Sequence, residues 1–348
     1  MKGYYKKIIT GFAATTMLCM MIGCGSVAPD TDGGADKDDE SIEIGMCFDS
    51  FVIERWEKDR DVFCDTASSL GATVNVQNAN GNVDKQIEQI EYLVDKGVDC
   101  LVIIPVDGDA ISDAVSAAIE KGIAVVSYDR LIPNVNTDLY ISFDNNEVGI
   151  MLGEAIADAG AENVIMICGP LTDNNVPMVN EGFLSVMEEN DIEILDSYNC
   201  EGWRAELGGA YVYDHMSLIK NADAIMCGND DVASSVIRAL AVSQLAGVIP
   251  VVGQDADLPA CQHIVEGTQL MTVYKPVGKL AEQAADLAVK LAKGESISVS
   301  SKINDGTYNV PYVAVEPIAV TADNMDEIII DSGFHTKEDV YLNRADTE

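Results

Sequence analysis

The chain has 348 residues, which exceeds the usual length of one domain, and 48% of them are hydrophobic, which is enough to form more than one core. Two lobes are therefore expected. Its formal net charge is -37, from 21 basic and 58 acidic residues. Because nucleic-acid binders present basic surfaces to the phosphate backbone, this charge excludes DNA and RNA as expected partners.

The first 23 residues have the layout of a secretion signal. Three lysines precede an apolar run from residue 8 to 22, which is too short for a permanent membrane span, and Gly23 stands before Cys24. This layout resembles a bacterial lipoprotein signal, in which cleavage before the cysteine leaves that cysteine lipidated. An ordinary signal peptide cleaved a few residues later is the alternative. We therefore expect an exported protein, held at the membrane by a lipid anchor on Cys24.

Residues 24–41 are rich in Gly, Asp and Ser and show no hydrophobic period, which is typical of a flexible acidic tether. Their spacing matches no calcium loop. The nine cysteines of the chain form no CxxC pair, and its three histidines lie far apart. We therefore expect neither a metal site nor a cofactor.

From residue 42 onward, short apolar runs rich in β-branched residues alternate with amphipathic segments. The first series of strands is expected at 42–48, 72–77, 99–105, 123–128 and 139–143, and the second at 163–169, 192–199, 223–228, 248–253 and 269–274. Helical patterns lie at 56–70, 83–97, 110–122, 177–190, 205–220 and 231–245, with a short one near 259–266. Such alternation predicts an α/β fold of two doubly wound lobes with parallel sheets.

Polar side chains gather where the predicted strands end, which is where open parallel sheets bind their ligands. The residues at these ends are Asp129, Arg130, Asp144, Asn145, Asp173, Asn175, Asn229, Asp230, Asp255 and Lys275. None of these loops carries GxGxxG or GxxxxGK[ST], so dinucleotide and phosphate sites are not favoured. Carboxylates, amides, Arg and Lys match the donors and acceptors of sugar hydroxyls, and the indoles of Trp56 and Trp203 can cover the apolar face of a pyranose.

Some of these polar residues also have a purely structural explanation. Asn82, Asn145 and Asp230 stand near the start of helical segments and are expected to cap them. Arg60 is expected on a solvated helix face, whereas Arg55, near the start of the first helix, is the better ligand candidate.

A glycoside-processing enzyme is the less favoured alternative. Asp129, Asp173 and Asp255 could supply its carboxylate pair, but the predicted site mixes acids with Arg and Lys and has no obvious isolated acid. A transcriptional regulator of the sugar-binding repressor type shares this core, but it needs an N-terminal helix-turn-helix where this chain has its signal. We therefore expect a binding protein and no catalytic residues.

Seven blocks of the sequence resemble the periplasmic sugar-binding proteins of the ribose/galactose/xylose group, and within it the D-xylose-binding members that serve bacterial ABC importers. The blocks are ERWEKDRDVF, NANGNVDKQIEQIEYLVDKGVDCLVIIP, YDRLI, DLYISFDNNEVG, GQDADL, GTQLMTVYKPV and DSGFH. By this resemblance the sugar contacts are Arg55, Trp56, Asp129, Arg130, Asp173, Asn175, Trp203, Asn229, Asp255 and Lys275. The segment CEGWRAELG at 200–208 departs from the family pattern of Asp-Gly-Trp followed by Pro-Glu, which leaves the sugar preference open.

The resemblance also implies how the chain is threaded. Hinges are expected near 142–146, 274–277 and 311–317, so that residues 42–144 plus 277–312 form an N-terminal lobe and residues 145–276 plus 313–348 a C-terminal lobe. A helix expected at 277–293 returns the chain to the N-terminal lobe. Closure about these hinges would bury the sugar between facing loops.

The function that follows is that of a solute-binding protein, expected as a monomer, that captures a monosaccharide, D-xylose in the first place. It would work at the periplasmic or cell-surface face of the cytoplasmic membrane and deliver the sugar to the permease of an ABC importer. A chemoreceptor or sensor kinase is a second possible reader of the closed form. A broader aldose receptor for glucose, arabinose or galactose is the alternative ligand class.

Overall fold

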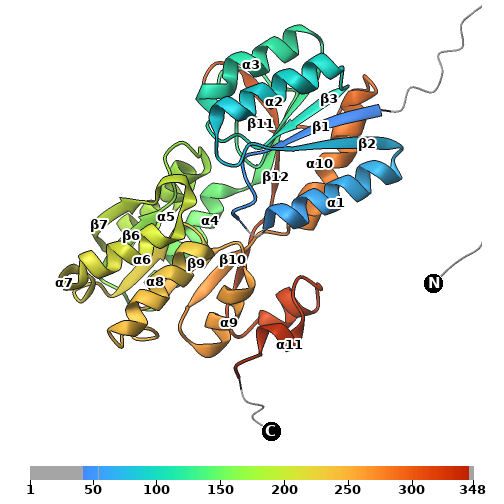
Figure 1. Cartoon of the computed structure of the whole chain (residues 1–348). Helices are drawn as coiled ribbons and strands as arrows, with labels where there is room; N and C mark the ends of the chain where they lie inside the picture. Colours follow the sequence, from blue (N-terminus) through green and yellow to red (C-terminus); the bar gives the residue numbers. More distant parts are fainter. Residues whose placement is uncertain (1–41, 54, 345–348) are drawn as a thin grey trace, which may run out of the picture. The chain divides into compact units, whose positions relative to one another are not determined.

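The computed structural model describes residues 42–53 and 55–344, so the predicted signal, tether and Cys24 anchor lie outside the described residues. Within these ranges the strands form two sheets flanked by helices (Figure 1). The first sheet has the order β11 (Lys302–Asn304), β12 (Asn309–Val315), β5 (Leu139–Phe143), β4 (Ala124–Tyr128), β3 (Cys100–Ile103), β1 (Ile42–Phe48), β2 (Ala72–Asn78). The second has the order β13 (Ile318–Val320), β10 (Met271–Tyr274), β9 (Val251–Gln254), β8 (Ala224–Cys227), β6 (Asn163–Cys168), β7 (Glu193–Asn199).

Neighbouring strands are parallel except for β11 with β12 and β10 with β13. Around the first sheet lie α1 (Arg55–Ser69), α2 (Val83–Lys96), α3 (Gly108–Glu120) and α10 (Val277–Ala292). Around the second lie α4 (Asn145–Asp158), α5 (Asn175–Glu189), α6 (Ala205–Asp214), α7 (Met216–Ile219), α8 (Asp230–Val242) and α9 (Leu258–Glu266). We call these assemblies the first and second lobes, and they confirm the predicted fold class of two doubly wound α/β lobes.

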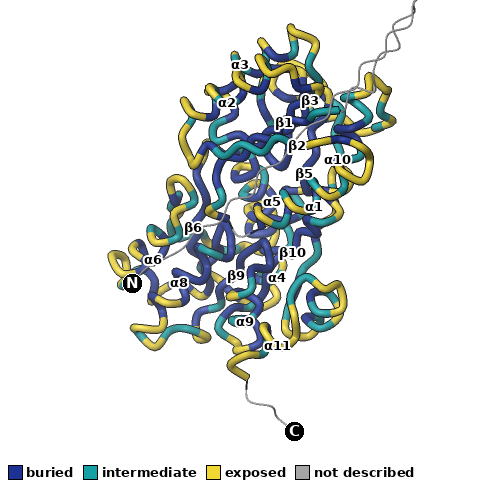
Figure 2. The backbone as a smooth tube through the Cα atoms, turned by 45° about the vertical axis from the view of Figure 1, so that its right-hand side comes forward, coloured by how far each residue is buried: buried dark blue, intermediate teal, exposed yellow. Residues whose placement is uncertain are grey.

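Each sheet is buried on both faces, as a parallel sheet requires. In the first lobe α2 and α3 pack on one face, and α1 and α10 on the other. In the second lobe α4 and α5 oppose α6 and α8. All four residues of β3 are buried, and Figure 2 shows buried strands beneath helices whose outer faces are exposed. The apolar runs of the sequence are therefore the inner layers of two separate cores.

The chain crosses between the lobes three times: after β5, after β10 and after β12. Strand β12 pairs with β5 through Val315, so the predicted boundary at residue 312 lies inside this strand. The last segment includes the π-helix Asp326–Ile330 and α11 (Lys337–Val340), and it packs on the second lobe. There Gln262 Nε2 on α9 donates to the Asp339 carbonyl at 2.8 Å. Strands β11 to β13 and helix α4 have no counterpart among the predicted elements.

The helix caps correct two sequence predictions. Asn82 caps α2, because its Oδ1 accepts from the Lys85 N–H at 2.8 Å. Asn145 and Asp230 do not cap the helices that follow; the residue before each one does, since the side chains of Asp144 and Asn229 accept from N–H groups of the first turn. Both predicted caps were placed one residue too late, and the two side chains turn into the protein instead, where they are fully buried.

Helix length also bears on the membrane. Across 42–53 and 55–344, every helix is too short or too polar to cross a bilayer.

The partly exposed Arg60 lies on α1 and pairs with its neighbour Asp61 at 2.7 Å, which agrees with its predicted position on a solvated face.

Candidate functional site

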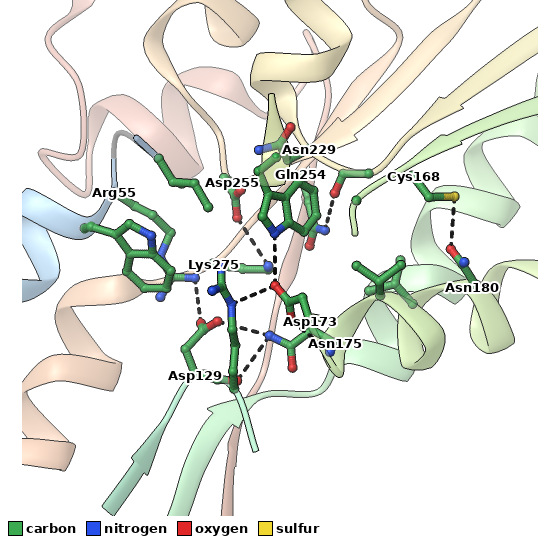
Figure 3. A pocket seen from close by; sticks show the side chains of 18 of the residues that line it. Arg55, Asp129, Cys168, Asp173, Asn175, Asn180, Asn229, Gln254, Asp255 and Lys275 are labelled. Carbon is green, nitrogen blue, oxygen red and sulfur yellow. Dashed lines mark hydrogen bonds and ion pairs between the residues drawn. The ribbon is translucent and has the colours of Figure 1, made fainter. Parts of the chain in front are cut away.

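A cavity lies between the lobes at the carboxyl ends of the strands (Figure 3). The structure brings together in its wall all ten residues proposed as sugar contacts, namely Arg55, Trp56, Asp129, Arg130, Asp173, Asn175, Trp203, Asn229, Asp255 and Lys275. Three other residues at strand ends, Asp144, Asn145 and Asp230, do not line it. The rule that ligands bind beyond strand ends therefore finds the region, but it does not by itself select the side chains that face inward.

The first lobe contributes a buried ion-pair chain that begins at α1. Arg55 Nη1 lies 2.9 Å from Asp129 Oδ2, and its Nη2 lies 3.0 Å from Asp59 Oδ1 one turn along the helix. Asp59 also accepts a hydrogen bond from the Tyr128 hydroxyl. Although burial raises the pKa of Asp129, the charges of Arg55, Lys275 and Arg130 outweigh it and hold that pKa below its usual range. Asp129 is therefore an ionised acceptor in the buried wall of the cavity.

Arg130, the next residue, joins the two lobes. Its Nη1 donates to Asp49 Oδ2 at 2.8 Å and to the Pro105 carbonyl at 3.0 Å, both in the first lobe. Its Nε lies 2.7 Å from Asp173 Oδ2, which follows β6 in the second lobe. All three charged residues are buried, so this pair needs the lobes in contact.

A second link between the lobes centres on the Asp129 backbone, which has the left-handed φ of +64°. Its carbonyl accepts from Ser142 Oγ at 2.6 Å and Tyr140 Oη at 3.1 Å, both on β5. Asn175, at the start of α5 in the other lobe, donates Nδ2 to the same carbonyl at 3.1 Å and to the Asp129 carboxylate at 3.0 Å. These bonds fix a strained residue in the site and tie it to lobe closure.

Trp203 is held by a hydrogen bond and a close packing contact within the second lobe. Its Nε1 donates to Asp173 Oδ2 at 3.1 Å, and its ring covers Gly169, where an added Cβ would stand 2.3 Å from a ring carbon. Trp203 also packs against apolar residues of both lobes. Across the cavity the Arg55 guanidinium lies 4.4 Å from the centre of the Trp56 ring. The two tryptophans thus supply the apolar surface expected for a sugar site.

Asp255 and Lys275 form the third ion pair of the wall, with Lys275 Nζ 3.2 Å from Asp255 Oδ1. Asp255 and Ala256 both have positive φ, +101° and +56°. Behind this turn Thr272 Oγ1 accepts from the Ala256 N–H at 3.1 Å, and His335 Nε2 lies 2.8 Å from the Ala256 carbonyl. The C-terminal segment therefore holds in place a turn that carries a site residue.

Several lining residues were missed by the sequence predictions: Ile53, Cys168, Gly169, Val176, Val179, Asn180, Met226, Gly228 and Gln254. Gln254 ends β9 directly before Asp255, so the strand-end rule could have found it. Val179 lies one helical turn after Asn175 on α5, a position that helical periodicity could have added. Burial raises the pKa of the Cys168 thiol to about 12, so this lining group is a thiol rather than a nucleophilic thiolate.

The chemistry of the wall favours binding a neutral polar molecule. Each lining cation is paired with a lining carboxylate: Arg55 with Asp129, Arg130 with Asp173 and Lys275 with Asp255. Within the described part of the chain, no group of three or more His, Cys, Asp or Glu side chains could hold a metal ion. The site therefore offers fixed donors and acceptors between two indoles.

Known proteins resemble this chain over most of its length. The periplasmic binding protein domain family matches residues 44–296. The chain is 41% identical over 308 residues to a D-xylose-binding periplasmic protein of Haemophilus influenzae, covering 87% of this chain and 93% of that protein. It is 38% identical over 307 residues to the protein so named in Escherichia coli, covering 86% and 93%. A solute-binding protein of an ABC transporter from Clostridium phytofermentans, solved with bound β-D-glucose, superposes with a TM-score of 0.78 at 27% identity, covering 86% of this chain and 99% of that one.

Proposed function

Because the chain belongs to the periplasmic binding protein family, we propose that it is an extracytoplasmic receptor that captures a monosaccharide, D-xylose in the first place, between its lobes. The observation that carries this proposal is the wall of three neutralised ion pairs and two indoles, drawn from both lobes. Charge-assisted hydrogen bonds to hydroxyl groups are stronger than neutral ones, so such a wall binds a sugar without demanding a charged ligand. The xylose assignment rests on the 41% and 38% identical relatives named for that sugar.

Capture is coupled to lobe closure in this proposal. Arg130 with Asp173, and Asn175 with Asp129, are contacts that only the closed arrangement allows. A sugar held by both lobes adds further bonds between them and shifts the population toward the closed form. The three crossovers are the proposed hinges, and residues up to 315 on β12 belong to the first lobe in our revised division.

The proposed partner of the closed form is the permease of an ABC importer, and a chemoreceptor or sensor kinase is a second candidate reader. We further propose export by the signal at residues 1–23, lipidation at Cys24, a monomeric state, and the absence of enzymatic activity. Mass spectrometry of the mature protein tests the anchor, because a diacylglyceryl group on Cys24 adds a defined mass. A mature N-terminus a few residues later, without lipid, would leave the export proposal intact and remove the anchor.

The decisive experiment is calorimetric titration of the ligand-stripped protein with xylose, glucose, arabinose, galactose and ribose. Tight binding of xylose with little or no binding of the hexoses supports the xylose assignment. Comparable binding of glucose supports the second candidate, a broader aldose receptor, which the glucose-bound relative and the divergent segment 200–208 favour. No heat with any of the five sugars would overturn the proposed function.

A further inference from the structure

Two side chains in the second-lobe wall each keep one polar atom without a hydrogen-bond partner among the described residues. These atoms are Asn229 Nδ2 and Gln254 Oε1, on residues that are only 1% and 4% exposed. Asn229 lies two residues beyond the end of β8 and Gln254 ends β9, the next strand of the sheet, and both residues line the cavity (Figure 3). Because an unpaired buried polar atom is costly, a ligand group is the natural partner for each.

The orientation of both amides follows from what their other ends contact. Gln254 points one end at the Gly228 carbonyl, 2.5 Å away, and a carbonyl can only accept, so that end is the nitrogen. Asn229 points one end at the Val232 N–H, 3.0 Å away, and an N–H can only donate, so that end is the oxygen. What remains for the cavity is an acceptor on Gln254 and a donor on Asn229.

We propose that Gln254 is a further sugar-binding residue, whose Oε1 accepts a hydrogen bond from one hydroxyl of the bound sugar. The inference rests on the proposed function and deepens it. Since the amide nitrogen is held by Gly228, Gln254 cannot turn round to donate, and the site therefore requires an O–H donor at that position of the sugar. Asn229 Nδ2 supplies the complementary donor from the adjacent strand end.

This role makes Gln254 a specificity determinant. A sugar that lacks the hydroxyl leaves Oε1 buried and unpaired. Replacing that hydroxyl with fluorine does not restore binding, because fluorine can accept but not donate. Losing such a bond to a buried group weakens binding by about 10-fold or more.

The test is a thermodynamic cycle between Gln254→Met and analogues of D-xylose in which one hydroxyl at a time is replaced by hydrogen or by fluorine. Calorimetry gives the Kd of the wild-type protein and the variant for each. We expect Gln254→Met to bind xylose about 10-fold more weakly than the wild-type protein. We also expect the deoxy and deoxyfluoro analogues of one position to bind wild-type protein and variant equally.

Gln269→Met is the matched control. Gln269 is also a buried glutamine, and it donates Nε2 to Asp230 Oδ1 at 2.8 Å and to the Met271 carbonyl at 3.1 Å, but it does not line the cavity. Its substitution is expected to leave the ratio of xylose affinity to analogue affinity unchanged at every position. If Gln254→Met weakens binding only by destabilising the fold, its ratios of xylose affinity to analogue affinity also stay unchanged.

Two outcomes overturn the inference while leaving the proposed function standing. In one, the wild-type protein binds xylose, and Gln254→Met weakens the binding of xylose and of every analogue by the same factor. The other, which does not depend on the variant folding, is a crystal structure with bound sugar in which Gln254 Oε1 lies more than about 3.5 Å from every sugar hydroxyl. If the wild-type protein binds no monosaccharide, the proposed function and this inference both fall.

Discussion

A single methyl group added at Gly169 should disable the site through Trp203. In Gly169→Ala the new Cβ would stand 2.3, 2.4 and 2.6 Å from three carbons of the indole, whereas ordinary contact begins at 3.4 Å. The ring must therefore retreat by at least about 1.1 Å, the difference between 3.4 and 2.3 Å. The φ of Gly169 is not positive, so alanine brings no backbone strain of its own.

The size of the effect follows from what holds the ring. Trp203 Nε1 donates to Asp173 Oδ2 at 3.1 Å, and a shift of that size lengthens or breaks the bond. Hydrogen bonds to charged groups contribute about 1.5–3 kcal/mol. If the ring keeps its proposed contact with the sugar it loses this bond, and if it keeps the bond it loses the proposed contact. Either way we expect xylose to bind about 10- to 150-fold more weakly.

Calorimetric titration of four proteins tests this reasoning: the wild type, Gly169→Ala, Trp203→Ala and the double variant. Trp203→Ala alone should weaken binding strongly, and combining it with Gly169→Ala should cost nothing more, because no ring remains to be displaced. Gly278→Ala is the matched control, since no atom lies within 4 Å of its added Cβ and binding should not change. Wild-type affinity in Gly169→Ala, or an equal loss with and without the indole, would refute the mechanism.

Three further predictions concern Asp255, Asp305 and Cys168. Asp255→Ala strands the buried Lys275 charge, so we expect a Kd for xylose at least about 100-fold weaker by calorimetry, and an unchanged Kd would contradict a role in the site. Asp305→Asn should lower the free energy of unfolding in urea by about 1–3 kcal/mol at pH 7, because its carboxylate accepts from the N–H groups of Val135, Asn136, Thr307 and Tyr308. Burial raises the pKa of Asp305, but these donors outweigh it and lower the pKa in the folded protein. The stabilisation by Asp305 is therefore present above about pH 4 and is lost as the pH falls through the folded pKa. A difference in the free energy of unfolding between wild type and variant that widened on acidification would contradict this. Cys168, with a thiol pKa of about 12, should react with a thiol reagent at pH 8 far more slowly than a free cysteine does, and rapid modification detected by mass spectrometry would show that the pocket opens or that its thiol is ionised.

The alternation of apolar and amphipathic segments was enough to predict both lobes, because buried parallel strands must be apolar along their whole length. Helix α4 was missed for a physical reason. It contains Gly149 and Gly153, which weaken a helical pattern, yet these glycines let α4 approach α5 closely. An added Cβ at Gly149 would stand 2.0 Å from the Val179 carbonyl oxygen. The pattern therefore weakened where the packing is tightest, and only the tertiary contact explains the glycines.

The candidate site was predictable in part. The polar residues at strand ends and the two tryptophans could be read directly, and the family resemblance placed Arg55, at the start of α1, and Trp203, in a short 3-10 turn, among the sugar contacts. The apolar residues that line the cavity, Val179 and Met226 among them, could not be distinguished from ordinary core by sequence alone. The cap predictions failed by one residue for a related reason, since a polar residue in a first turn can cap the helix or turn inward, and tertiary partners decide which.

The charge balance of the wall limits what the site can hold. Arg55, Arg130 and Lys275 neutralise Asp129, Asp173 and Asp255, and removing one partner of a buried pair typically costs about 3–5 kcal/mol because the other charge is left alone. Asp49 and Asp59 pair with the same two arginines, so five carboxyl groups share three cations, and burial raises the pKa of Asp49 and Asp59 above the usual range. An anionic sugar acid would add a carboxylate to this surplus, whereas a neutral sugar uses the same donors and acceptors without changing the charge. The wall therefore favours neutral sugars over their uronic acids, and one of its pairs, Arg130 with Asp173, also joins the lobes.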